Sequence, residues 1–288
     1  MQRRTWLIGV LVTGIVTLSL DARQQPQLFR SSVDLVPVFA TVTNPDGSFA
    51  RGLTKGDFTV LDNRAPQEIT SFSNEAQAIS ASVILDTSGS MASALPRVFG
   101  AARAFLDRLT AEDRAMVGSL FFVGPPLTAD KARLRTSLDM LPRDPGSPVF
   151  AALDRSLTAL KPESNRRVIV IYSDGKNSNT GPFRATTSDQ LLSRVETEGV
   201  MVYAIGFEGV SISGAVKNIA KRSGGRATEL KGTDDLSLAL AAVADELHQQ
   251  YLLGFTPAAF DGQVHKIEVR VQKPGVTVRA RETYVAVR

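Results

Sequence analysis

The chain of 288 residues contains no cysteine. This absence excludes disulfide bonds, a thiol nucleophile and lipid attachment through an N-terminal cysteine. Lysine and arginine form no runs and the formal net charge is only +4, so the composition does not indicate nucleic acid binding. A Gly-x-x-x-x-Gly-Lys loop, which would indicate nucleotide hydrolysis, does not occur. A chain without cysteine must be held together by its apolar core, or by its core and a metal.

Catalytic histidine chemistry is also poorly supported, because only two histidines are present, His248 and His265. We interpret the first as a solvated helix residue and the second as a strand-surface residue. No Gly-x-Ser-x-Gly motif surrounds Ser88 or Ser90, the serines of the most polar loop. The sequence therefore does not predict an enzyme.

Residues 1–22 have the pattern of a secretory signal peptide. Arg3 and Arg4 give a basic start, and the apolar segment from Trp6 to Leu20 is shorter than the roughly 20 residues that cross a membrane comfortably. We expect cleavage after Ala22 and a periplasmic or secreted protein. The alternative is an uncleaved anchor, which would be the only membrane contact; the folded part is exported in both cases.

The spacing of apolar residues divides the rest of the chain into three segments. Residues 31–77 and 250–288 alternate apolar and polar side chains as half-buried strands do, whereas residues 78–249 alternate strands with helices. We expect residues 78–249 to form an α/β domain with a Rossmann-like, doubly wound, mostly parallel sheet. The two flanks would together form a small β-sandwich domain, because each alone is a marginal hairpin.

The α/β segment contains its most informative stretch at residues 83–91, Val-Ile-Leu-Asp-Thr-Ser-Gly-Ser-Met. The apolar run up to Leu85 is typical of a strand buried on both faces, and the polar turn from Asp86 would lie at the carboxyl edge of the sheet, where open α/β sheets bind ligands. This turn offers a carboxylate and hydroxyls, including Ser88 and Ser90. Hard oxygen donors without cysteine or histidine suit Mg²⁺, Mn²⁺ or Ca²⁺ and do not suit zinc or copper.

Two further loops carry oxygen donors. One precedes the helix that begins at residue 149 and contains Asp144 and Ser147; the other is Ser173-Asp174-Gly175, after an apolar strand. We expect both to be strand-end loops that meet the Asp86 loop at one edge of the parallel sheet.

These residues resemble the von Willebrand factor type A domain and its metal-ion-dependent adhesion site. Asp86, Ser88 and Ser90 match the family's Asp-x-Ser-x-Ser loop, Asp174 matches its third-loop aspartate, and Ser147 stands where the family usually has threonine. The resemblance covers about residues 78–248. The flanking segments 52–58 and 251–255 are similar to those of secreted bacterial proteins related to this family.

The resemblance implies a function as well as a fold. In the family, hydroxyls bind a divalent cation directly, and the aspartates act largely through water or as hydrogen-bond acceptors. The cation, Mg²⁺ or else Mn²⁺ or Ca²⁺, keeps an open position for an aspartate or glutamate of a partner protein. The family resemblance thus implies a metal-dependent protein-binding module of the adhesion type.

Two other interpretations remain open. Ser88 and Ser90 could merely cap the following helix, leaving a structural or assembly protein with a degenerate or purely stabilising metal site. A metal-dependent phosphohydrolase would use Asp86 as nucleophile, but it needs a second acid at the position of Ser88.

Several side chains outside the motif also have an expected place. We expect Phe121 and Phe122 to belong to the core at a strand end. We expect Asn177, Ser178 and Phe183 to contribute to the rim that faces the partner.

Overall fold

A computed structural model of the chain describes residues 35–173, 177–178, 182–183, 186–206, 211–231 and 235–287. The chain divides into two units, residues 1–33 and 34–288, and the description below concerns the second. The predicted signal peptide and Asp174 lie outside the described residues. Within the described ranges, none of the helices has the length and apolar character needed to span a bilayer.

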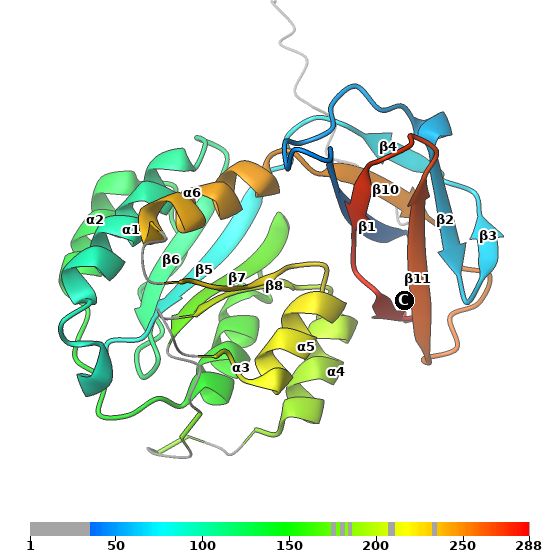
Figure 1. Cartoon of the computed structure of the whole chain (residues 1–288). Helices are drawn as coiled ribbons and strands as arrows, with labels where there is room; N and C mark the ends of the chain where they lie inside the picture. Colours follow the sequence, from blue (N-terminus) through cyan, green and yellow to red (C-terminus); the bar gives the residue numbers. More distant parts are fainter. Residues whose placement is uncertain are drawn as a thin grey trace, which may run out of the picture. The chain divides into compact units, whose positions relative to one another are not determined.

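A parallel five-stranded sheet forms the centre of the α/β segment (Figure 1). Its strand order is β6-β5-β7-β8-β9, so β5, the first strand of this sheet along the chain, lies inside the sheet. All seven residues of β5 are buried, as expected for a strand covered on both faces. The strands are β5 (Ile79–Leu85), β6 (Arg114–Ser119), β7 (Arg166–Ser173), β8 (Met201–Gly206) and β9 (Ala227–Glu229).

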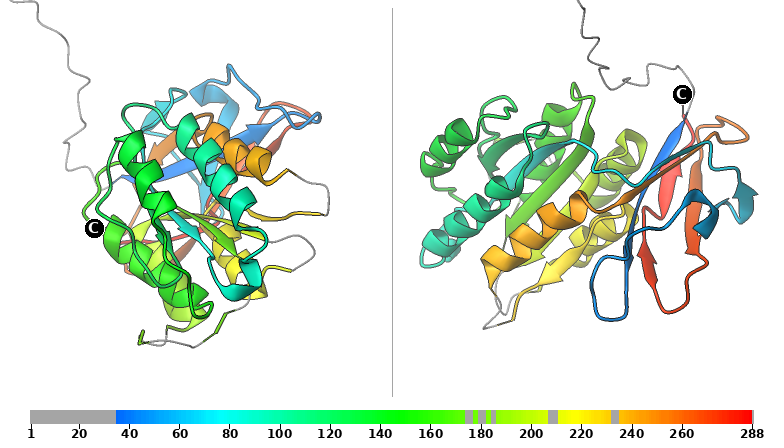
Figure 2. Two further views of the ribbon diagram at one scale, coloured as in Figure 1. Left: turned by 90° about the vertical axis from the view of Figure 1, so that its left-hand side faces the viewer. Right: turned by 90° about the horizontal axis from the view of Figure 1, so that it is seen from above.

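Helices cover both faces of this sheet, as Figures 1 and 2 show. One apolar cluster joins the sheet to α1 (Leu95–Arg108), α2 (Lys131–Asp139) and α6 (Leu236–Leu247). A second cluster joins the opposite face to α3 (Val149–Leu160), α4 (Ser188–Glu198) and α5 (Gly214–Arg222). This doubly wound arrangement confirms the predicted fold class.

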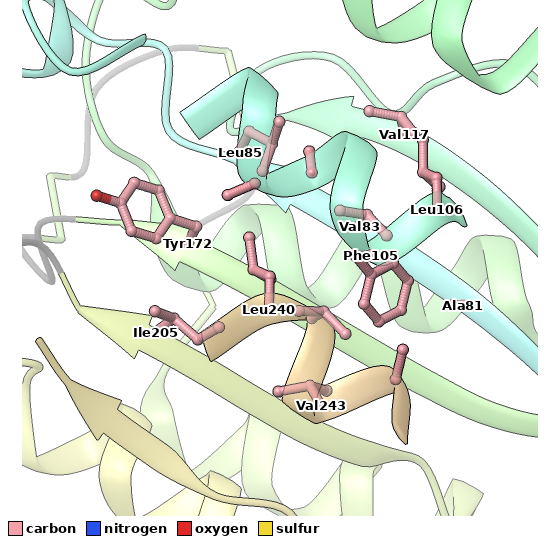
Figure 3. Close-up of a cluster of buried hydrophobic side chains, with 14 of the residues drawn as sticks. Ala81, Val83, Leu85, Phe105, Leu106, Val117, Tyr172, Ile205, Leu240 and Val243 are labelled. Atoms are coloured by element: carbon pink, nitrogen blue, oxygen red, sulfur yellow. The ribbon is translucent and has the colours of Figure 1, made fainter. Parts of the chain in front are cut away.

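The first cluster reaches the end of β5, where the polar turn begins. Figure 3 shows Leu85 in the same buried cluster as side chains of α1 and α6, including Leu106 and Leu240. All three are fully buried. Because Leu85 is fixed by the core, the position of the next residue, Asp86, is fixed as well.

The flanks form two four-stranded antiparallel sheets, and each sheet contains strands from both ends of the chain. The orders are β12-β1-β10-β4 and β13-β11-β2-β3, with one apolar cluster packed between them. The β-sandwich built from both flanks is therefore confirmed. Its strands are β1 (Val36–Thr43), β2 (Phe58–Asp62), β3 (Ala65–Gln67), β4 (Ser71–Ser73), β10 (Tyr251–Phe255), β11 (Val264–Val271), β12 (Thr277–Arg279) and β13 (Thr283–Val285).

Turn chemistry explains where this sandwich differs from the sequence pattern. The alternation from Glu68 to Phe72 predicts one strand, whereas the structure has β3 before it and β4 at its end. Asn63 and Arg64 both have positive φ, which makes a two-residue hairpin turn of the type that matches strand twist, and this turn starts β3 early. Pro66 is tolerated because β3 is an edge strand.

The two histidines are less exposed than predicted. The side chain of each is only 12% exposed. His248 lies 2.9 Å from Asp113, and His265 lies 2.8 Å from Asp62. His248, expected to be solvated, and His265, expected at the strand surface, are therefore both partly buried, because each contacts a buried carboxylate that the sequence pattern does not reveal.

Candidate metal centre

Asp86 is held between two neighbouring strand ends. It directly follows β5, and its side chain is fully buried. One carboxylate oxygen, Oδ1, accepts a hydrogen bond from the backbone N–H of Ser88 at 3.0 Å, and Oδ2 accepts one from the hydroxyl of Ser173 at 2.9 Å. Ser173 ends β7, which pairs directly with β5. The first and third predicted loops therefore meet at one edge of the sheet.

The two serines of the motif lie side by side. The hydroxyl oxygens of Ser88 and Ser90 are 3.1 Å apart, with Ser88 buried and Ser90 exposed. Ser88 precedes a single 3-10 turn, η2 (Gly89–Met91), without capping it through its side chain. Helix α1 has Ala94 as its N-cap and receives no side-chain cap. These serines are therefore not used as the cap of α1, contrary to the alternative that the sequence leaves open.

The loop that carries Ser147 connects α2 to α3 and not a strand to a helix, so the prediction of a strand-end loop is wrong for this segment. Hydrogen bonds still tie it to the first loop: the Thr87 hydroxyl donates to the carbonyl of Pro142 at 2.7 Å. Ser147 is buried. Its backbone N–H donates to the Ser178 hydroxyl and its carbonyl accepts from the Ser178 N–H, both at 2.9 Å. Polar contacts, and not the strand order, place this loop beside Thr87.

Asp144, which the sequence analysis places only in a loop of oxygen donors, has a structural role that the sequence did not predict. It is 5% exposed, and its carboxylate accepts hydrogen bonds from the Ser119 hydroxyl at 2.6 Å and from the backbone N–H groups of Leu120 at 3.0 Å and Phe121 at 3.1 Å. The N–H of Thr87 approaches it at 3.4 Å. One buried carboxylate therefore joins the end of β6, the Asp86 loop and the Ser147 loop. Its position two residues after Pro142 gave no signal of this role.

Phe122 lies outside the core, which corrects the sequence-based expectation for that residue, whereas Phe121 packs against the second apolar cluster. Strand β6 ends at Ser119, and the turn that follows leaves Phe122 44% exposed and Phe121 half-buried. The Phe121 ring contacts Phe183 edge-on at 5.1 Å between centroids. These aromatic side chains lie next to the loop that Asp144 holds.

Arg155 of α3 lies behind these rings. Its guanidinium carbon is 3.9 Å from the centroid of the Phe183 ring, and it donates a hydrogen bond to the carbonyl of Leu120. Burial lowers the pKa of Arg155, and Asp144 and Asp154 partly offset that effect. The guanidinium thus supports the turn between β6 and the aromatic pair.

Asn177 and Ser178, expected at the partner-facing rim, are bound to the start of α3. The Asn177 side chain accepts a hydrogen bond from the N–H of Phe150 at 3.0 Å, and the Ser178 hydroxyl accepts one from the N–H of Ser147 at 2.9 Å. Asn177 is nevertheless exposed. Residues 177–178 are thereby held against the Ser147 loop and the start of α3.

The donor set fits a hard divalent cation. Among the described residues, Asp86 supplies a carboxylate and Ser88 and Ser90 supply adjacent hydroxyl oxygens, and the loop contains neither cysteine nor histidine. In the same part of the chain, no three histidine, cysteine, aspartate or glutamate side chains converge as in a carboxylate-rich metal cage. The described part of the candidate site thus combines one carboxylate, from Asp86, with the neutral hydroxyl oxygens of Ser88 and Ser90.

The comparisons with known proteins identify the family to which the fold belongs. The von Willebrand factor type A domain family matches residues 82–241, which is more than half of the chain. The chain therefore belongs to the von Willebrand factor type A domain family. No curated protein matches the chain at a significant level.

Solved structures show the same fold at low sequence identity. A von Willebrand factor type A protein from Catenulispora acidiphila is similar with a TM-score of 0.52 and 12% identity, over 89% of this chain and 75% of that one. Proximal thread matrix protein 1 from the mussel byssus is similar with a TM-score of 0.51 and 16% identity, over 65% of this chain and 51% of that one. This chain thus spans about half the length of the mussel protein.

Proposed function

We propose that this protein is an exported, non-enzymatic binding module that holds a partner protein through a divalent cation. Asp86, Ser88, Ser90, Ser147 and Asp174 are the proposed metal-site residues, with Mg²⁺ as cation, or Mn²⁺ or Ca²⁺ in its place. The observation that carries the proposal is the pair of adjacent hydroxyls beside a buried, oriented carboxylate at the carboxyl edge of the sheet.

The chemistry of the donors favours binding over hydrolysis. Hydroxyl ligands are neutral, so a cation held mainly by Ser88 and Ser90 keeps most of its positive charge. The Asp86 carboxylate is engaged by the Ser88 N–H and the Ser173 hydroxyl, which orients it and makes it a poor nucleophile. A carboxylate from an aspartate or glutamate of the partner is the hard, charged ligand that suits such a cation.

Calorimetry with Mg²⁺, Mn²⁺ and Ca²⁺ tests the metal site directly. Ser90→Ala is the sharpest variant, because Ser90 is exposed and its loss leaves the core intact. Ser93→Ala is the matched control, since Ser93 is an exposed serine three residues further along. We expect Ser90→Ala to lower the affinity by about 10-fold or more, and Ser93→Ala to leave it unchanged. Equal affinities for the two variants would refute the assignment.

Asp86→Ala extends this test to the buried carboxylate. We expect this variant to lose metal binding, and Asp86→Asn, which keeps the side-chain size and one acceptor oxygen, to weaken it. Circular dichroism of each variant without metal confirms that the fold is retained. Metal affinity equal to that of the wild type in Asp86→Ala would contradict the proposal.

A structural or assembly role is the second candidate, because the β-sandwich could itself be the binding part while the cation only stabilises the α/β segment. A chelator separates the two functions. If the cation bridges to the partner, EDTA abolishes partner binding; if it is only a stabiliser, EDTA lowers the melting temperature while partner binding persists. Hydrolysis of a generic phosphate ester would instead support a phosphohydrolase. Such an enzyme needs a second acidic residue where this chain has Ser88.

A further inference from the structure

The turn after β6 exposes aromatic surface beside the proposed metal site. Among the described residues, five large hydrophobic side chains are exposed, and Phe122, at 44%, is the only aromatic one. Phe121 and Phe183 are half-buried and in edge-on contact next to it. Large exposed aromatic side chains are typical of binding surfaces, since they lose little conformational entropy on binding.

Hydrogen bonds fix this aromatic surface to the site. The Ser119 hydroxyl donates to Asp144 and accepts from the N–H of Phe122 at 3.2 Å, while the N–H of Phe121 donates to Asp144. Asp144 is the same carboxylate that the Thr87 N–H approaches in the Asp86 loop. The aromatic surface is therefore a rigid neighbour of Asp86 and not a loosely attached loop.

Close packing of glycine restricts the turn further. A Cβ atom added to Gly124 would lie 1.9 Å from the carbonyl oxygen of Val117, so the chain after Phe122 returns against β6 with no room for a side chain. An added Cβ at Gly118 would likewise lie 2.5 Å from the carbonyl oxygen of Phe122, so the backbone on both sides of this turn is held close.

The charges around the aromatic surface suit an acidic partner. Arg155 stacks on Phe183 at 3.9 Å with its Nε and Nη1 atoms buried, so the positive group that a ligand can reach here is Arg143, which is exposed and next to Asp144 in sequence. The aspartates of this region, Asp86 and Asp144, are buried and hydrogen-bonded, so they present little negative charge to a ligand. An exposed arginine and an exposed aromatic side chain thus lie on the two loops that the Asp144 carboxylate joins.

We propose that the partner is an acidic protein segment with an aromatic or large aliphatic side chain within two residues of its metal-binding carboxylate. The carboxylate binds at the cation, and the apolar side chain packs against Phe122 and the Phe121–Phe183 pair. This inference rests on the proposed function and specifies its ligand. An aromatic contact of this kind contributes about 3- to 10-fold in affinity.

Selection from a random peptide library displayed on phage tests the ligand chemistry. The full chain is immobilised in Mg²⁺ and bound phage are eluted with EDTA. We expect recovered peptides to contain aspartate or glutamate with phenylalanine, tyrosine, tryptophan or leucine within two positions. Recovery of acidic peptides without an apolar neighbour overturns the inference and leaves the proposed function standing. Recovery that does not depend on the cation overturns both.

Variants then assign the apolar preference to the aromatic surface. Binding of a selected peptide, labelled with a fluorophore, is measured by anisotropy for Phe122→Ser and for the control Val264→Ser, which removes a 51% exposed apolar side chain from β11 of the sandwich. We expect Phe122→Ser alone to weaken the peptide about 3- to 10-fold, with unchanged Mn²⁺ affinity by calorimetry. Equal peptide affinities of the two variants, with both melting as the wild type does, overturn the inference.

Discussion

Removal of the Asp144 carboxylate is the most informative test of how the site is built. Asp144 is 5% exposed and accepts three hydrogen bonds of 2.6–3.1 Å from Ser119, Leu120 and Phe121. In Asp144→Ala these donors lose their acceptor inside the protein. A buried donor without a partner costs about 1–3 kcal/mol, and loss of one member of a buried charged group costs about 3–5 kcal/mol.

We therefore expect Asp144→Ala to lower the free energy of unfolding by about 3–5 kcal/mol. For a domain of this size, 1 kcal/mol corresponds to about 2–4 °C in melting temperature, so the expected decrease is about 6–20 °C. Asp144→Asn keeps the shape and one acceptor oxygen and should lose about 1–3 kcal/mol. Both values come from equilibrium denaturation in urea, with thermal melting as a second measurement.

Asp139→Ala is the control. Asp139 lies five residues before Asp144 and forms an ion pair with Arg103, but its side chain is 54% exposed. An exposed ion pair contributes at most about 1 kcal/mol. The reasoning is refuted if Asp144→Ala and Asp139→Ala have the same denaturation midpoint. A further expectation is that Asp144→Ala lowers Mn²⁺ affinity by about 10-fold, since the Asp86 loop loses its support.

Other parts of the chain give three independent predictions. Burial acts against the charged form of His265, but hydrogen bonds to Asp62 and Asp261 outweigh burial and raise the pKa of this histidine. The stabilisation of the folded state by the charged imidazole is complete below about pH 6.5 and is lost as the pH rises through the folded-state pKa. The difference in denaturation midpoint between wild type and His265→Gln should therefore shrink above that pKa. Glu246→Ala should cost about 3–5 kcal/mol in urea denaturation, because Glu246 is a buried partner of Arg279 and Tyr203; a loss below about 1 kcal/mol, the value expected for exposed Asp245→Ala, would contradict this. Gly100→Ala should stabilise α1 by about 0.5–1 kcal/mol, because an added Cβ there has open space; a lower melting temperature would contradict it.

Much of the fold could be predicted because periodicity reports burial directly. The unbroken apolar runs of β5 and β7 and the helical spacing of Val98, Ala101 and Phe105 are sequence features of the same packing that the structure shows. The short strands were harder. Between Asp62 and Ser73 the backbone of Asn63 and Arg64 decides where β3 begins, and a positive φ at arginine has no sequence signature.

The candidate site was predictable only where its residues are adjacent in sequence. Asp86, Ser88 and Ser90 share one loop, so their spacing predicts their proximity. Asp144 acts through contacts with residues 23 to 57 positions away, which no local pattern encodes. Phe122 looked like core because it follows a buried strand, but β6 ends three residues earlier and the chain turns at Ser119.

The sandwich also explains how a chain can carry so long an insertion. Strands β4 and β10 are hydrogen-bonded neighbours, with Ser73 paired to Leu252, although the whole α/β segment separates them in sequence. For an unstructured connection, each doubling of length would oppose this pairing by only about 0.6 kcal/mol, and a folded insert with neighbouring ends reduces even that. The α/β segment therefore behaves, for the sandwich, as an enlarged hairpin tip. Exchanging it for another domain, or for a short turn, would also require replacing Arg279 of β12, whose guanidinium pairs with the buried Glu246 of α6.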